Sequence, residues 1–417
     1  MNLYLFNDND SAAIYGIGTY LKELAHALES VAVNVHIVHL HSDRPKFEIV
    51  KSKRIEYWYI PEIRNNNTFS GSIQKVEDYF RNVIYLFRLH IKDTNNLIFH
   101  FNYNQCQALA KGLKELFECK TITTVHFIKW EFELHGNLFR YHTLKSKPKN
   151  QMNSFEQSLY TTDEYESLLY KEVDRVIALS HYTQHILETE YQIDIGKISI
   201  IPNGLEDTNS IQVSNRNSLR RKWHISENEL IILFAGRLQP VKGLIFLIKA
   251  FFKVLEEIPN CRLMVAGSGN YNTHLQAAKD ICTKIAFTGL LEKEELYEMY
   301  QIADIGVIPS LYEPFGYVAL EMMMHELPIV ATATSGLNEV VDESCGLKIP
   351  LTVQSDMVEI DTNLLAEKIL YLLQHPTEAK KMGQNGRKRY LKEYSSEVFR
   401  RNMLELYESL FEINTKF

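Results

Sequence analysis

Short apolar runs alternate with amphipathic segments along most of the chain. Runs of about five to eight apolar residues predict strands, and the segment 16–30, whose apolar residues recur at a helical period, predicts a helix. In the N-terminal half the strands are predicted at 2–6, 33–40, 97–101, 120–125, 175–179 and 197–202. Because strands separated by helices are typical of βαβ units, this pattern predicts an α/β fold built on a parallel sheet.

The alternation lapses at 203–222, where the residues are polar and rich in turn formers. It restarts with strands predicted at 229–236, 261–267, 284–289, 304–309 and 327–332, a helix at about 242–257, and helices from about 362 to the end. A chain of 417 residues is too long for one compact core. We therefore expect two α/β domains in tandem, 1–205 and 206–394, with a cleft between them and a last helix in 395–417.

Composition and charge exclude several functional classes. The formal net charge of -7 argues against non-specific nucleic-acid binding, which needs a basic surface. No apolar run approaches the roughly 18–20 residues of a membrane span, and MNLYLFNDND lacks the basic start and long apolar stretch of a signal peptide. The five cysteines are scattered and odd in number, which favours a reducing compartment. We expect a cytoplasmic protein.

The strongest candidate chemistry lies in SLYEPFGYVALEMM (310–323), directly after a predicted strand. Pro314 keeps Glu313 extended, Gly316 permits close backbone approach, and the helix that follows offers its N-terminal amides to an anion such as a phosphate. Glu321 lies more than a turn inside that helix. One carboxylate can therefore bind sugar hydroxyls and the other ribose hydroxyls, with phosphates between them. The alternative is a pair of helix-capping acids on a surface turn.

A second candidate is the loop AGRLQPVKG (235–243), which also follows a predicted strand. Arg237 and Lys242 place two cations in one loop, and Gly243 follows. Fixed cations suit a diphosphate leaving group because its negative charge grows as the sugar departs, and they would remove the need for a metal. The alternative is a solvated basic turn before a helix.

The first strand leads into YGIGTYL (15–21), in which Gly16 and Gly18 open a helix. The third glycine of a dinucleotide fingerprint is missing, and so is the acid expected about 20 residues on, which argues against a nicotinamide-dependent oxidoreductase. Close backbone approach to a phosphate is the better interpretation, with tight helix–strand packing as the alternative. His126 follows another strand and could bind a sugar hydroxyl, although a lone histidine is more often structural.

Weaker candidates for metal or membrane binding are scattered through the N-terminal half. Asp8 and Asp10 form an Asp-x-Asp pair, and His36, His39 and His41 cluster, but only His39 and His41 would share a strand face. We expect no metal site there. The basic and aromatic stretches at 81–92 and 139–149 predict either contact with anionic lipid headgroups or solvated surfaces. The segment 129–154 lacks clear periodicity and is predicted as a long loop, either an acceptor lid or poorly ordered.

Taken together, these motifs resemble retaining glycosyltransferase family four (glycosyl transferases group 1). The two hallmarks are EPFGYVALE (313–321), two glutamates enclosing Pro-Phe-Gly, and GRLQPVKG (236–243). Further matches are found in IPNGL (201–205), FTGLL (287–291), SGLNEVV (335–341), LSHYT (179–183) and MGQNGRKRY (382–390). The resemblance implies the GT-B fold, two Rossmann-like domains facing across a cleft. The acceptor would bind the N-terminal domain, the nucleotide sugar the C-terminal domain, and the last helix would pack back on the N-terminal domain.

The resemblance also implies roles for single residues in a hexosyltransferase that needs no cofactor or metal. Glu313 and His126 would contact the donor sugar, Glu321 the ribose, and Arg237 and Lys242 the diphosphate of a UDP- or GDP-sugar. The remaining donor contacts would come from Gly16, Gly18, Leu291, Phe315, Gly316, Tyr317 and Val318. Many members carry Gly-Gly at the first turn, whereas Tyr15 precedes Gly16 here, so the phosphate contact at that turn is less specific.

The acceptor and the exact reaction are open at the level of sequence. A lipid-linked or surface glycan fits the family's common role in polysaccharide biosynthesis, at the inner face of the membrane. The opening YLFNDNDSAAIYGIGTY (4–20) resembles a branch that modifies ribosomal peptides. A nucleotide-sugar epimerase of the same fold and a non-catalytic protein that binds the donor are further alternatives. The two glutamates disfavour the epimerase, and the complete set of charged residues argues against the non-catalytic protein.

Overall fold

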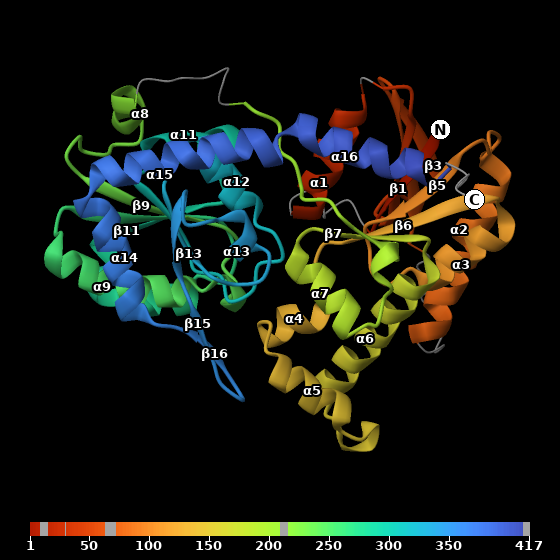
Figure 1. The fold of residues 1–417 in the computed structure, drawn as a ribbon, viewed down its shortest axis with the longest axis horizontal. Coiled ribbons are helices and arrows are strands. Elements are labelled where there is room, and N and C mark those ends of the chain that lie inside the picture. Colours follow the sequence, from red (N-terminus) through yellow and green to blue (C-terminus); the bar gives the residue numbers. More distant parts are fainter. Residues whose placement is uncertain (9–15, 30, 63–71, 209–215, 412–417) are drawn as a thin grey trace. The chain divides into compact units, whose positions relative to one another are not determined.

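The computed structural model describes residues 1–8, 16–29, 31–62, 72–208 and 216–411 (Figure 1). The chain forms two compact units. The first unit comprises Met1–Lys129, Pro148–Gly204 and Ser396–Phe417, and the second comprises Trp130–Lys147 and Leu205–Ser395. The second unit therefore includes a short segment from the middle of the N-terminal half.

The first unit is built on an eight-stranded sheet. Its strands are β1 (Asn2–Asn7), β2 (Asn34–Ser42), β3 (Glu48–Ser52), β4 (Ile55–Pro61), β5 (Leu97–Phe101), β6 (Cys119–Val125), β7 (Arg175–Ala178) and β8 (Ile198–Ile200). The order is β3-β4-β2-β1-β5-β6-β7-β8, and every pairing is parallel except β3 with β4. The sequence pattern predicted β1, β2, β5, β6, β7 and β8 but missed β3 and β4.

Helices cover the first sheet on both faces because the side chains of its central strands alternate between two apolar layers. Phe6 on β1 and Phe99 on β5 contact Phe87 of helix α2. On the opposite face of β5, His100 contacts Tyr407 of helix α16. The helices are α1 (Gly16–Leu28), α2 (Ser72–His90), α3 (Gln107–Leu116), α6 (Ser154–Glu172), α7 (His181–Thr189) and α16 (Ser396–Ser409).

The second unit is built on a six-stranded parallel sheet of order β11-β10-β9-β12-β13-β14, and a two-stranded antiparallel hairpin, β15-β16, is separate from it. The strands are β9 (Leu230–Ala235), β10 (Cys261–Ala266), β11 (Ile285–Gly289), β12 (Ile305–Ile308), β13 (Ile329–Thr332), β14 (Gly346–Ile349), β15 (Leu351–Val353) and β16 (Val358–Ile360). β14, β15 and β16 were missed from sequence. The parallel sheets confirm the predicted α/β class.

Helices lie on both faces of the second sheet (Figure 1). Helices α9 and α14 pack together on one face, and α12 contacts α11, α13 and α15 on the other. The helices are α8 (Arg216–Lys222), α9 (Leu244–Glu257), α10 (Asn272–Ala277), α11 (Lys293–Ile302), α12 (Tyr317–Met324), α13 (Leu337–Val340), α14 (Thr362–Gln374) and α15 (Pro376–Arg389). Helix α9 begins two residues later than predicted because Pro240–Lys242 forms a 3-10 turn and Gly243 adopts φ +67°.

Two predictions about irregular segments need correction. The segment 129–154 is not a long loop: it contains α4 (Lys129–Leu134), α5 (Leu138–Ser146) and a 3-10 turn at Lys149–Gln151. Helix α4 spans only six residues, too few to show a helical period in the sequence. The polar stretch 203–222 includes helix α8. Arg216 Nη2 of this helix donates a hydrogen bond to Asp304 Oδ1 at 2.7 Å. Residues 209–215 of that stretch lie outside the described residues.

Candidate active site

The predicted donor residues of the second unit follow neighbouring strands. The carboxyl ends of parallel strands share one edge of the sheet, and ligands of open α/β sheets bind outside that edge. Along it, β11 leads to Leu291, β9 to Arg237 and Lys242, and β12 to Glu313. The strand order, with β9 beside β12, therefore brings together loops that are separated by about 70 residues in the sequence.

Glu313 and Lys242 form a direct ion pair. Lys242 Nζ donates to Glu313 Oε2, and Ser310 Oγ donates to the same oxygen at 3.2 Å. The Lys242 side chain is 19% exposed and the Glu313 side chain is 15% exposed, so the pair is largely shielded from water but still reachable by a ligand. Burial makes an unpaired charge costly, so the contact fixes the orientation of both side chains. The two hallmark motifs thus meet at one site.

The backbones of these two loops are also in contact. Leu311 N–H donates to Val241 O at 2.7 Å. A Cβ on Gly243 would lie 1.8 Å from Pro309 O, a separation that no side chain tolerates. Together with its φ of +67°, this close approach requires glycine directly after Lys242. In the Lys-Gly pair of the second hallmark motif, the lysine is therefore explained by its ion pair and the glycine by the lack of space for a side chain.

A set of hydroxyl groups holds the loop that carries Glu313. Thr332 Oγ1 donates to Ser310 O at 2.5 Å, and Thr334 Oγ1 donates to Leu311 O at 2.9 Å. Ser335 Oγ donates to Glu313 O at 2.7 Å and accepts from Glu313 N–H at 3.0 Å. These hydroxyls come from the end of β13 and the residues after it. Sequence reasoning missed them, although the run Thr-Ala-Thr-Ser at 332–335 directly after an apolar strand was a readable signal.

The Pro-Phe-Gly turn connects this loop to α12. Gly316 has φ +104°, a left-handed conformation that favours glycine, and it precedes the first helical residue, Tyr317. Phe315 is buried at 3% exposure, so it contributes packing, whereas Tyr317 and Val318 remain partly exposed on α12. The N-terminal amides of α12 begin next to Glu313, where a helix favours an anion.

Glu321 lies on the same partly exposed side of α12, one turn beyond Tyr317 and Val318. Tyr300 Oη of helix α11 donates to Glu321 Oε2 at 2.7 Å. Burial first, and then the adjacent Glu321 carboxylate, raise the pKa of Tyr300 well above its usual value, so Tyr300 stays a hydrogen-bond donor. Glu321 is thus a held carboxylate within the site.

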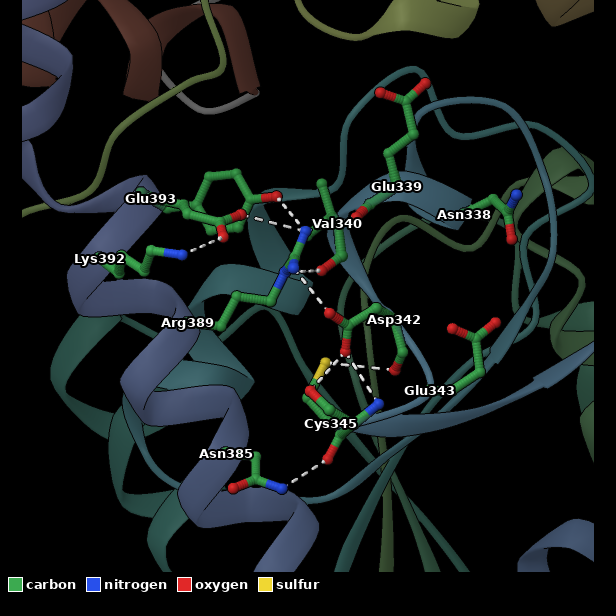
Figure 2. Close-up of polar contacts among 12 residues, drawn as sticks. Asn338, Glu339, Val340, Asp342, Glu343, Cys345, Asn385, Arg389, Lys392 and Glu393 are labelled. Carbon is green, nitrogen blue, oxygen red and sulfur yellow. Dashed lines mark hydrogen bonds and ion pairs between the residues drawn. The ribbon is translucent and has the colours of Figure 1, made fainter.

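Arg389 fixes the far end of the short helix α13, as Figure 2 shows. Its guanidinium donates to Glu339 O at 2.9 Å, Val340 O at 3.2 Å and Asp342 Oδ2 at 2.6 Å. The near end of α13 touches the site, because Leu337 N–H donates to Glu313 O at 3.2 Å. A planar guanidinium, with its several N–H donors, suits a set of two backbone carbonyls and one carboxylate. Arg389 therefore anchors a helix whose other end contacts Glu313.

The remaining predicted site residues belong to the first unit. Gly16 is the exposed first residue of α1 after β1, and Gly18, two residues further, is buried. His126 follows β6, with its Nε2 2.9 Å from Asn102 Oδ1 and its ring edge-on to Tyr20. Burial lowers the pKa of His126 to about 3, so the ring is neutral near pH 7. Asn102 Oδ1 requires the proton on Nε2, which leaves Nδ1 as an acceptor.

The weak metal candidates lie partly within the described residues. Asp8 Oδ1 lies 2.8 Å from His41 Nδ1, while Asp10 lies outside the described residues. Within the described ranges, no group of three or more histidine, cysteine, aspartate or glutamate side chains could hold a metal ion. Each described cysteine is a free thiol.

Two family models match most of the chain, one in each half. Residues 14–209 match the family model for glycosyltransferase family 4, and residues 215–389 match the model for glycosyl transferases group 1. A lipopolysaccharide 1,2-N-acetylglucosaminetransferase of Salmonella typhimurium is 26% identical over 254 residues, 56% of this chain and 63% of that protein. An uncharacterized glycosyltransferase of Methanocaldococcus jannaschii is 37% identical over 154 residues, 35% of this chain and 38% of that protein. A mannosylfructose-phosphate synthase of Agrobacterium fabrum is 32% identical over 187 residues, 42% of this chain and 41% of that protein.

The fold is shared over nearly the whole chain with solved structures. Sucrose-phosphate synthase of Thermosynechococcus elongatus superposes with a TM-score of 0.75 at 22% identity, covering 99% of each chain. An Anabaena protein solved in complex with UDP-glucose superposes with a TM-score of 0.71 at 15% identity, covering 98% of this chain and 100% of that one. The fold is GT-B, with two Rossmann-like domains. From the two family models and this fold, the chain belongs to glycosyltransferase family 4.

Proposed function

We propose that this protein transfers a sugar from a nucleotide-diphosphate sugar to an acceptor, with retention of anomeric configuration and without a metal. The observation that carries the proposal is the shielded Lys242–Glu313 pair at the carboxyl edge of the second sheet. Glu313 would accept hydrogen bonds from the donor sugar. Lys242, Arg237 and the N-terminal amides of α12 would face the diphosphate, and Glu321 would hold the ribose.

The proposed chemistry places developing charge beside these fixed donors. The bond between the anomeric carbon and the diphosphate oxygen breaks, and a new bond forms on the same face to the acceptor oxygen. The acceptor proton passes to the departing diphosphate. Cations aimed at the leaving group are worth most in a shielded site because they need no reorganisation during the reaction. Neutral His126 would orient the sugar through Nδ1, and no protein nucleophile takes part.

For the substrates we propose a UDP- or GDP-sugar as donor and a lipid-linked or surface glycan as acceptor. The Anabaena structure with UDP-glucose supports the donor class, and the Salmonella lipopolysaccharide transferase supports the acceptor class. Basic stretches carrying Tyr85, 59% exposed, and Phe139, 61% exposed, would suit work at the inner face of a membrane. Among the described helices, none is long and apolar enough to cross a bilayer.

The first test is nucleotide release from a panel of UDP-, GDP- and ADP-sugars without acceptor, with and without EDTA. Slow hydrolysis of one donor that survives EDTA supports a metal-free transferase and identifies the donor. Loss of release in EDTA would contradict the metal-free mechanism. Interconversion of the sugar without nucleotide release would indicate the epimerase instead.

Two further measurements test the residue roles and the stereochemistry. Glu321→Ala is expected to weaken donor binding at least tenfold, and unchanged affinity would remove Glu321 from the site. NMR of the glycosylated product gives the anomeric configuration, and an inverted product would exclude same-face attack.

A further inference from the structure

The α4–α5 segment, Trp130–Lys147, belongs to the second unit although it lies between β6 and α6 of the first unit in the sequence. The chain leaves the first unit after Lys129 and returns at Pro148. Trp130 and Tyr141 stack at a ring distance of 4.1 Å and are both buried, which joins the two short helices. The segment is therefore a packed helical hairpin rather than a solvated loop.

Two buried polar side chains fasten the α4–α5 segment to the rest of the second unit. Glu131 is completely buried, and its Oε2 accepts a hydrogen bond from Tyr312 Oη at 3.0 Å. Asn137 is also completely buried, and its Nδ2 donates to Gln354 O at 2.8 Å. A buried carboxylate is costly unless hydrogen bonds satisfy it, so the Glu131–Tyr312 contact is specific rather than incidental.

Tyr312 is the residue directly before Glu313. The backbone of residues 310–313 is fastened by the hydroxyls of Thr332, Thr334 and Ser335, all from the end of one strand. The Tyr312 side chain, 2% exposed, instead extends to Glu131, 181 positions away in the sequence. The orientation of Glu313 thus depends on anchors from two unrelated parts of the chain.

We propose that Glu131 is a positioning residue for the donor sugar, acting through Tyr312 on Glu313. This inference rests on the proposed role of Glu313 in binding the sugar. Removing the Glu131 carboxylate takes away the acceptor that orients the buried Tyr312 hydroxyl, so Tyr312 is held less firmly in its present position. A displaced Tyr312 carries the adjacent Glu313 away from the sugar, whereas Glu321, proposed for the ribose, is held separately by Tyr300 Oη of α11 at 2.7 Å.

The expected result is a selective loss. Glu131→Leu should weaken binding of the nucleotide sugar about tenfold, equivalent to about 1.4 kcal/mol, while binding of the matching nucleotide diphosphate changes less than twofold. Tyr312→Phe should show the same selectivity, because it removes the same Glu131–Tyr312 hydrogen bond from the other side. Glu131→Gln keeps an acceptor oxygen and should retain most of the affinity. A merely structural role would lower both affinities or neither.

The experiment is isothermal titration of the full chain with UDP and UDP-glucose first, then with the pair that the donor panel identifies. Tyr390→Phe is the matched control, because Tyr390 is a buried tyrosine of the same unit whose Oη donates to Leu205 O at 2.8 Å. It should lower stability without changing the ratio of the two affinities.

The outcomes separate this inference from the proposed function. If the wild-type chain binds no nucleotide sugar, both are wrong. If the wild type binds and Glu131→Leu or Tyr312→Phe keeps the wild-type ratio of affinities, the positioning role is wrong while the function stands. If Glu131→Leu does not fold, Tyr312→Phe alone decides.

Discussion

Gly243→Ala tests whether the Lys242 loop and the Glu313 loop are held in contact by backbone geometry. An added Cβ would lie 1.8 Å from Pro309 O and 3.3 Å from Ile360 Cδ1, at a φ of +67°. The left-handed conformation costs an alanine about 1–2 kcal/mol, and overpacking adds about 1–3 kcal/mol. We expect a total near 3 kcal/mol, which for a domain of this size lowers the Tm by about 6–12 °C.

Gly289→Ala is the matched control, because Gly289 has φ +80° and nothing within 4 Å of an added Cβ. It carries the conformational cost without the clash, so we expect about 1 kcal/mol and a Tm lowered by about 2–4 °C. Hydrogen exchange of β9 and β12 peptides, followed by mass spectrometry across a urea series, reports the unfolding of the second unit by itself. Equal effects of the two substitutions would refute the close approach as a rigid feature of the site.

Three further predictions concern single side chains. Lys242→Met should reduce kcat about 10²–10³-fold with the identified donor, because it removes a charge that faces the leaving group; a change below threefold in initial rates would argue against that role. Arg389→Lys should lower the stability of the second unit by about 2 kcal/mol and weaken donor binding, because a lysine cannot donate to all three acceptors of Arg389 at once. Urea unfolding measures the stability and titration calorimetry the donor binding, and wild-type values in both would contradict the anchoring role. Burial raises the pKa of Glu166 from 4.5 to about 8, so the folded state holds a proton that the unfolded state releases. This contribution to stability is full below pH 4.5 and falls by about 1.4 kcal/mol per pH unit as the pH rises towards 8. In Glu166→Gln this pH dependence of the free energy of unfolding should disappear. If the wild type and the variant differ in free energy of unfolding by the same amount from pH 5 to 8, the prediction is wrong.

The regular elements and the hallmark motifs could be predicted from the sequence because their causes are local. Completely buried strands such as β12 are continuous apolar runs, and the strand–turn–helix at 304–324 is marked by Pro314 and Gly316. The weaker local signals failed. β3 has mostly exposed residues, and α4 spans only six residues, so neither shows a clear period. The fold class and the family followed from the strong signals alone.

The arrangement of the candidate site was decided by the tertiary structure. The sequence named Lys242 and Glu313, but only the strand order, with β9 between β10 and β12, makes them an ion pair. The hydroxyls of Thr332, Thr334 and Ser335 reach the Glu313 loop because β13 pairs with β12.

The contact between Glu131 and Tyr312 shows this limit most clearly. Glu131 lies in a stretch whose pattern predicted a loop, and its partner is 181 positions further along the chain. Local periodicity reports which face of an element is buried, but it does not report which distant group lies against that face. The sequence by itself determined the central strands, the fold class and the charged residues of the site. The pairing of those residues, and the buried contacts that orient them, depended on how the strands and the α4–α5 segment pack in three dimensions.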